Sequence, residues 1–327
     1  MLAPLERQGL PETIAAIQQA KRIVLACHVN PDGDTLGSML SLGLALERLG
    51  KDVTRLSSDG IPEILTFLPE VEKVQILTNR RDFDLAIVVD AGELSRTGNS
   101  REAVESAPLL IDIDHHVTAG VFGQIRLLDA KAAATGELIY DLLNVLGVEI
   151  DLPIATLLMT ALLTDTGSFR FPNTTPRTMR VAAELREVGA SPNDIAEQVF
   201  ENKSFAAQKI LGCALDSLKC SPDGRIVWAS VTQEDFIAFG AIDADTEGIV
   251  NAVRSVRGAD VAIFLREAPD GRLRVSLRAK EGFDVSQVAA VFGGGGHRLA
   301  SGCTLDGPLA DAEARLLEEV QKRLPSE

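Results

Sequence analysis

Short apolar runs alternate with longer helical patterns through the first half of the chain. The runs at residues 22–27, 84–92 and 107–116 are rich in Ile, Val and Leu, as buried strands are. The stretch at 36–50 has the spacing of a helix and ends at Gly50. Apolar strands separated by helices predict an α/β fold in which a parallel sheet carries helices on both faces. Ligands bind such sheets beyond the carboxyl ends of the strands.

The pattern becomes helical between about residues 133 and 215, and no Gly/Ser-rich or Pro-rich linker interrupts it. Strand-like runs then return at 225–232, 260–267 and 272–279. We therefore predict an α/β domain over residues 1–190, a helical linker over 191–220, and a smaller α/β domain over 221–327.

No segment of the sequence predicts a membrane span or an export signal. No stretch approaches the roughly 20 apolar residues that a membrane helix needs. Residues 2–20 carry Glu6, Arg7 and Glu12 and lack an unbroken apolar core. The four cysteines form no C-x-x-C pair, which argues against a disulfide framework or a zinc finger. We expect a cytoplasmic protein with no membrane partner.

The net charge of −15 at pH 7 argues against a protein that holds long nucleic acid. It does not exclude a small anionic substrate in a local pocket. Residues 254–298 carry eight basic and five acidic side chains, so this segment has a local charge of +3.

Aspartate and histidine residues gather where the predicted strands end. The stretch HVNPDGDTLGS, after the first strand, holds His28, Asp32 and Asp34, and its Pro31 and Gly33 predict a loop. The later residues of this kind are Asp90, Asp114, His115, His116 and Asp165. Each aspartate alone could cap a helix, and a lone histidine is often only a satisfied polar residue. Independent caps need not collect at strand ends with three of the four histidines, so the set predicts a metal site.

The donor types narrow the choice of metal. Carboxylate and imidazole groups without thiolate favour Mn²⁺, Mg²⁺, Fe²⁺ or Co²⁺ over structural zinc. Six or seven ligands exceed the needs of one ion but suit two ions about 3.5–4 Å apart with a shared carboxylate. Such a pair activates a water for in-line attack on a phosphoryl group. We expect two divalent ions, Mn²⁺ first, with Mg²⁺ or Co²⁺ as alternatives.

The motifs HVNPDGDTLGS, VVDAG, DIDHH and LLTDTGSF, in this order, resemble those of the DHH phosphoesterase family, named for the triplet at 114–116. This likeness covers roughly residues 20–190. The stretches SLRA (276–279) and FGGGGHRLASG (292–302) are similar to the DHH-associated substrate-binding domain. Arg298 stands where the family often has lysine, which keeps the positive charge.

The resemblance implies how the metal ligands divide. Asp90 would bridge the two ions. The first ion would also take His28 and Asp32, and the second would take Asp34, His115 and Asp165.

The resemblance also implies the catalytic and substrate-binding residues. Beside Asp90, His116 would face the substrate and assist the leaving oxygen, and Asp114 would orient a histidine. In the second domain, backbone N–H groups of a glycine run can approach a phosphate closely, and an arginine can bind it with two hydrogen bonds. The expected substrate-binding residues are Arg278, Gly294, Gly295, Gly296 and His297.

The size and the pair of domains are most similar to the stand-alone nano-RNases of this family, which also dephosphorylate pAp (adenosine 3′,5′-bisphosphate). We therefore expect hydrolysis of very short oligoribonucleotides and of pAp, without long nucleic acid as a partner. The nearest alternative is a cyclic di-AMP or pApA phosphodiesterase. A RecJ-like exonuclease is usually longer, and a non-catalytic nucleotide-binding protein would be expected to lack a ligand. The oligomeric state, a homodimer included, and the exonuclease direction stay open.

Overall fold

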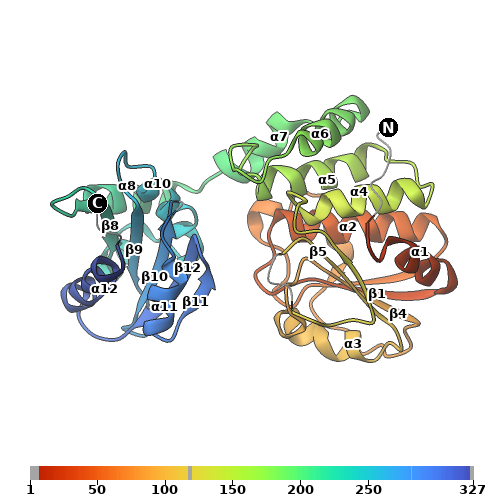
Figure 1. Ribbon diagram of the computed structural model, residues 1–327, viewed down its shortest axis with the longest axis horizontal. Helices are drawn as coiled ribbons and strands as arrows, with labels where there is room; N and C mark the ends of the chain where they lie inside the picture. Colours follow the sequence, from red (N-terminus) through yellow and green to blue (C-terminus); the bar gives the residue numbers. More distant parts are fainter. Residues whose placement is uncertain (1–6, 117–119, 281, 325–327) are drawn as a thin grey trace. The chain divides into compact units, whose positions relative to one another are not determined.

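A computed structural model describes residues 7–116, 120–280 and 282–324. The chain divides into two compact units, Met1–Asn202 and Lys203–Glu327, which are described separately (Figure 1).

The first unit contains a six-stranded sheet in the order β3-β2-β1-β4-β5-β6, and every strand pair in it is parallel. The strands are β1 (Arg22–Ala26), β2 (Asp52–Leu56), β3 (Val74–Gln75), β4 (Leu85–Val89), β5 (Leu110–Asp114) and β6 (Ile125–Leu128). This confirms the predicted parallel α/β fold. β4 and β5 are buried along their whole length; β4 is wholly apolar, whereas β5 also buries Asp112 and Asp114.

Helices cover this sheet unequally on its two faces. The helices are α1 (Leu10–Gln19), α2 (Gly33–Arg48), α3 (Arg101–Glu105), α4 (Thr135–Val145), α5 (Leu152–Asp165), α6 (Pro176–Val188) and α7 (Pro192–Ala196), with shorter turns η1 (Glu63–Leu65), η2 (Val71–Lys73), η3 (Leu94–Ser100) and η4 (Glu197–Glu201). Figure 1 shows α2, α4 and α5 stacked over one face and α3 on the other. α5 packs between α2 and α6, and all of its leucines except Leu152 at its first position are buried.

The second unit contains a mixed six-stranded sheet in the order β11-β12-β10-β9-β8-β7, in which β8 and β9 are parallel and the other pairs antiparallel. Its strands are β7 (Lys219–Cys220), β8 (Ile226–Val231), β9 (Val261–Glu267), β10 (Leu273–Ala279), β11 (Gly295–His297) and β12 (Ala300–Leu305). Its helices are α8 (Phe205–Asp216), α9 (Gln233–Phe239), α10 (Ile249–Arg254), α11 (Val285–Val291) and α12 (Leu309–Arg323), with the turn η5 (Asp243–Thr246). One core joins the sheet to α8, α9 and α10, and another joins it to α11 and α12.

The expected linker region, residues 191–220, is helical for most of its length. It contains α7, the single π-helical turn η4, and α8. α7 and η4 belong to the first unit and α8 to the second. Within the part of the chain that the structure describes, no helix is long and apolar enough to cross a membrane.

Candidate metal centre

The first histidine-aspartate motif lies between β1 and α2. Asp32 caps α2, and its carboxylate accepts a hydrogen bond from the Thr35 amide at 3.0 Å. Asp34 therefore sits in the first turn of the helix. We expected a loop here and a helix from residue 36; residues 27–32 do form a loop, but the helix begins at Gly33, so its expected start was wrong. A Cβ on Gly33 would lie 2.4 Å from the Thr164 side chain, so this glycine lets α2 pack closely on α5 rather than breaking it.

Asp90 follows β4 and has a left-handed backbone, with φ at 57°. This conformation is uncommon outside glycine and often marks functional sites, although aspartate tolerates it better than most residues. Two hydroxyl groups hold its buried carboxylate: Thr35 donates to Oδ2 at 2.7 Å and Thr135 donates to Oδ1 at 3.0 Å. The two carboxylate oxygens of Asp90 thus face different threonines.

The candidate ligand atoms form groups that meet at Asp90. In one group, Nε2 of His28 lies 3.7 Å from Oδ2 of Asp90 and 4.0 Å from Oδ2 of Asp32. In the other, Nε2 of His115 lies 3.5, 3.6 and 3.7 Å from carboxylate oxygens of Asp165, Asp90 and Asp34. All six expected metal ligands therefore come together.

The backbone fixes the orientation of the two imidazoles. Nδ1 of His28 lies 2.7 Å from the Val29 carbonyl oxygen, and Nδ1 of His115 lies 3.3 Å from that of Ala132. Because a carbonyl only accepts hydrogen bonds, Nδ1 carries the proton in each ring. Nε2 is then the ring atom that faces the carboxylates, as in a metal-ligating histidine.

The centre holds more buried carboxylate than the protein alone neutralises. Burial raises the pKa of Asp34 and of Asp90 well above the ordinary range, and it also raises the pKa of Asp165. Burial lowers the pKa of His28, which favours the neutral form of this ring. The amides of Thr135 and Gly136 at the start of α4 donate to Asp34 at 2.7 and 2.9 Å. Crowded carboxylates beside imidazoles are a donor set that divalent cations fit.

His116 has a different environment from the other two histidines. Its Nδ1 lies 2.6 Å from Oδ1 of Asp114 and 3.5 Å from Oδ1 of Asp90. The hydrogen bond to Asp114 raises the pKa of His116 to about 9. Burial raises the pKa of Asp114, but hydrogen bonds from His116 and from the Gly92 amide outweigh it and leave that pKa below its ordinary value. An imidazolium held in this way can donate a proton.

Two hydroxyl residues of the centre, Thr35 and Thr135, are not among the residues predicted from the motifs. Besides holding Asp90, the Thr35 hydroxyl lies 2.6 Å from Nε2 of His28. Thr35 stands inside the HVNPDGDTLGS motif, and Thr135 begins the helical stretch TGEL. Only their positions near the charged residues of the motifs could have pointed to them. Threonine is too common for its presence alone to predict a contact with Asp90.

The second unit places the backbones of the other predicted residues side by side. Arg278 of β10 pairs with Ala300 of β12, which pairs in turn with His297 of β11. The side chain of His297 lies outside the described part of the structure. The half-buried Arg278 donates to the Leu277 carbonyl at 3.0 Å, and burial lowers its pKa. No carboxylate within the described ranges forms an ion pair with it.

Two glycines of the run have a packing role. A Cβ on Gly294 would lie 2.2 Å from the Gly302 carbonyl oxygen. Gly296 has φ at 138°, and a Cβ there would lie 2.7 Å from the Ala300 oxygen. A Cβ on Gly295 would meet nothing within 4 Å. Close approach of β11 to β12 thus explains two of the glycines without a ligand, whereas Gly295 has no such explanation.

Comparison with known proteins agrees with this geometry. The DHH family, N-terminal domain, matches residues 22–162, and the DHHA1 domain matches residues 224–325. The bifunctional oligoribonuclease and PAP phosphatase NrnA of Thermus thermophilus is 36% identical over 305 residues, covering 92% of this chain and 90% of that protein. The chain belongs to the DHH phosphoesterase family.

Solved structures show the same fold in other DHH proteins. An exopolyphosphatase-related protein from Bacteroides fragilis superposes with a TM-score of 0.91 at 27% identity, covering 96% of each chain. RecJ from Thermus thermophilus, solved in complex with Mn²⁺, has a TM-score of 0.56 at 17% identity and shares the fold alone. That match covers all of this chain (100%) and 56% of RecJ.

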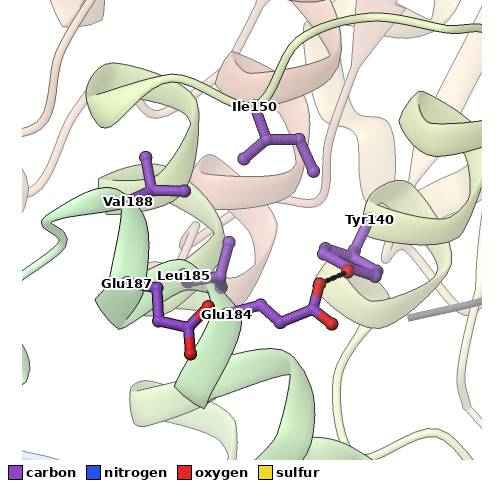
Figure 2. Close-up of a pocket in the computed structure, with 6 residues that line it drawn as sticks. All are labelled: Tyr140, Ile150, Glu184, Leu185, Glu187 and Val188. Carbon is purple, nitrogen blue, oxygen red and sulfur yellow. Dashed lines mark hydrogen bonds between the residues drawn. The ribbon is translucent and has the colours of Figure 1, made fainter. Parts of the chain in front are cut away.

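A separate pocket of this DHH protein lies among its helices. It has a volume of about 210 Å³ and is lined by Tyr140, Ile150, Glu184, Leu185, Glu187 and Val188. Figure 2 shows the hydrogen bond from the Tyr140 hydroxyl to the Glu184 carboxylate, beside apolar side chains. It contains no residue of the candidate metal centre.

Proposed function

We propose that this phosphoesterase hydrolyses very short oligoribonucleotides to mononucleotides and dephosphorylates pAp to AMP at a two-metal centre. The observation that carries the proposal is the position of Asp90. One of its oxygens faces His28, and the other faces His115. A carboxylate that lies between two sets of donor atoms can bridge two metal ions.

The donor atoms divide naturally between two ions. His28 and Asp32 would hold one ion, and Asp34, His115 and Asp165 the other, with Asp90 shared. Such ions, when bound, polarise the phosphoryl group and lower the pKa of an attacking water. Oxygen and imidazole donors favour Mn²⁺ and also allow Mg²⁺ or Co²⁺.

The other catalytic roles belong to His116 and Asp114. His116 would donate its proton to the leaving oxygen, because its raised pKa keeps it charged at neutral pH. Asp114 would hold the ring through the 2.6 Å hydrogen bond at Nδ1. Since Asp114 also accepts from the Gly92 amide, it is fixed from two sides.

The substrate class rests on the relatives and on charge. The relative named above is an oligoribonuclease and PAP phosphatase, and it matches along nearly the whole chain. The net charge of −15 disfavours long nucleic acid, and we propose that Arg278, Gly294, Gly295, Gly296 and His297 bind the nucleotide. A cytoplasmic location is consistent with four free cysteines, and homodimer formation stays a prediction.

The test is Mn²⁺-dependent turnover of pAp, pApA, cyclic di-AMP, a 3-mer RNA and a 24-mer RNA. We expect pAp and the 3-mer to be hydrolysed well and the 24-mer poorly at low salt, because the acidic surface repels a long strand. Higher salt should reduce the difference between the rates on the 3-mer and the 24-mer, because it screens that repulsion. Preference for cyclic di-AMP or pApA would replace the proposed substrate class. Equal rates on the two RNAs would favour a RecJ-like exonuclease, and no turnover of any substrate would favour a nucleotide-binding protein.

A further inference from the structure

Arg96 lies between the loops that carry two of the candidate metal ligands. It belongs to η3, and its carbonyl oxygen accepts a hydrogen bond from the Val29 amide at 2.7 Å. Its Nη1 donates to the carbonyl oxygen of Ala91 at 3.2 Å. Val29 follows His28, and Ala91 follows Asp90. The backbone and the side chain of Arg96 are therefore tied to different sides of the centre.

The guanidinium also lies close to the His116 side of the centre. A Cβ on Gly92 would lie 3.7 Å from Nη1 of Arg96. The same Gly92 donates its amide to Asp114 at 2.6 Å, and Asp114 holds His116.

This arginine has no carboxylate partner among the described residues, although the centre is rich in carboxylates. Neighbouring arginines do have partners: Arg81 pairs with Glu102, and Arg101 pairs with Glu105 at 2.8 Å. A guanidinium offers five N–H donors, and the bond to Ala91 uses one of them. A half-buried arginine with unused donors beside a phosphoesterase centre is suited to an anionic oxygen of the substrate.

We propose that Arg96 binds the scissile phosphate itself, on the side of the centre where His116 lies. This inference rests on the proposed function of the same site. It differs from the role of Arg278, because a residue that binds the reacting phosphate serves every phosphate ester, whereas Arg278 serves only substrates with a nucleotide.

The experiment compares Arg96→Ala and Arg96→Lys with the matched control Arg101→Ala, which removes an exposed arginine from the next helix. Each protein, loaded with Mn²⁺, is assayed on bis-p-nitrophenyl phosphate and for inhibition by inorganic phosphate. We expect Arg96→Ala to lower kcat/KM and to weaken phosphate inhibition by about 10- to 100-fold, as loss of a charged hydrogen bond does. Arg96→Lys should fall between, and Arg101→Ala should match the wild type.

A rescue arm separates phosphate binding from a bracing role for the Arg96 side chain. Low millimolar guanidinium should restore part of the activity of Arg96→Ala and leave the wild type unchanged. Loss of activity with unchanged phosphate inhibition and no rescue would overturn the proposal, as would activity within about twofold of the wild type. If Arg96→Ala does not fold, the same assays are made with Arg96→Gln. If the wild type hydrolyses the generic ester but neither pAp nor short RNA, the proposed substrate class fails while the test of Arg96 stands.

Discussion

Replacing Asp90 with asparagine tests the bridging role without changing the shape of the side chain. An amide oxygen can still accept from one threonine hydroxyl, and the amide nitrogen can donate to the other. The contacts to Thr35 and Thr135 are therefore retained in part. The variant loses one negative charge between His28 and His115, where we place the shared ligand of two ions.

The metal-free variant should be more stable than the metal-free wild type. Burial raises the pKa of Asp90, so ionising this carboxylate costs more free energy in the folded protein than in the unfolded chain. Such a carboxyl group reduces stability progressively as the pH rises above its ordinary, unfolded pKa, and asparagine removes this effect. The advantage should disappear as the pH falls below the ordinary pKa of aspartate, near 3.8.

With Mn²⁺ present, the wild type should instead be more stable than Asp90→Asn. A ligand at a hundred times its Kd stabilises a protein by about 2.7 kcal/mol. For a unit of about 200 residues this raises Tm by roughly 5–10 °C, since each kcal/mol gives about 2–4 °C. We expect this shift in the wild type and little or none in Asp90→Asn, which loses a ligand to each ion.

The assay is thermal unfolding of both proteins with chelator and with Mn²⁺, followed by turnover of pAp. Turnover of the variant should fall below detection. The reasoning is refuted if Asp90→Asn shows the full Mn²⁺ shift, or retains substantial activity, or is clearly less stable than the wild type in chelator at pH 8.

Three further predictions concern residues outside the ligand set. Asp112 is buried 3.7 Å from Nε of Arg126, and burial raises its pKa to about 7. Its contribution to the unfolding free energy should therefore fall as the pH rises from about 4 to about 7, by at most about 4 kcal/mol. Urea titrations at several pH values should show this pH dependence in the wild type and not in Asp112→Asn. An unchanged pH dependence in the variant would contradict the prediction. Arg278→Ala should harm pAp turnover far more than turnover of bis-p-nitrophenyl phosphate, because remote binding energy positions only the nucleotide; equal losses would indicate a folding role. Gly295→Ala should keep the wild-type Tm, since a Cβ there meets nothing, and should raise KM for pAp if the backbone approaches a phosphate; an unchanged KM would remove Gly295 from the binding site.

The sequence predicted the centre of the first sheet because its strands are buried on both faces. β1 is almost entirely apolar and β4 wholly so, and in β5 the apolar residues alternate with Asp112 and Asp114. Such short apolar runs are typical of buried strands in a parallel sheet. β2 and β6 lie farther from the centre, are partly exposed and carry Arg55 and Arg126, so their pattern was not distinctive. Such strands are determined by pairing with their neighbours, and the local sequence carries little of that information.

The candidate ligands were predictable because charged residues at strand ends are conspicuous. The contacts that fix them were not. The Thr35 and Thr135 hydroxyls reach Asp90 only after α2 and α4 have packed beside the sheet, and the role of Arg96 depends on two loops meeting. Gly33 was misinterpreted as a helix breaker because its close contact with Thr164 is a tertiary feature.

The most direct test of the two-metal account is an anomalous difference map from crystals of the wild-type protein grown with Mn²⁺. The account predicts two peaks per chain, about 3.5–4 Å apart, one on either side of the Asp90 carboxylate. One should lie next to His28, and the other should lie next to His115. A single peak, or peaks that Asp90 does not contact, would contradict it.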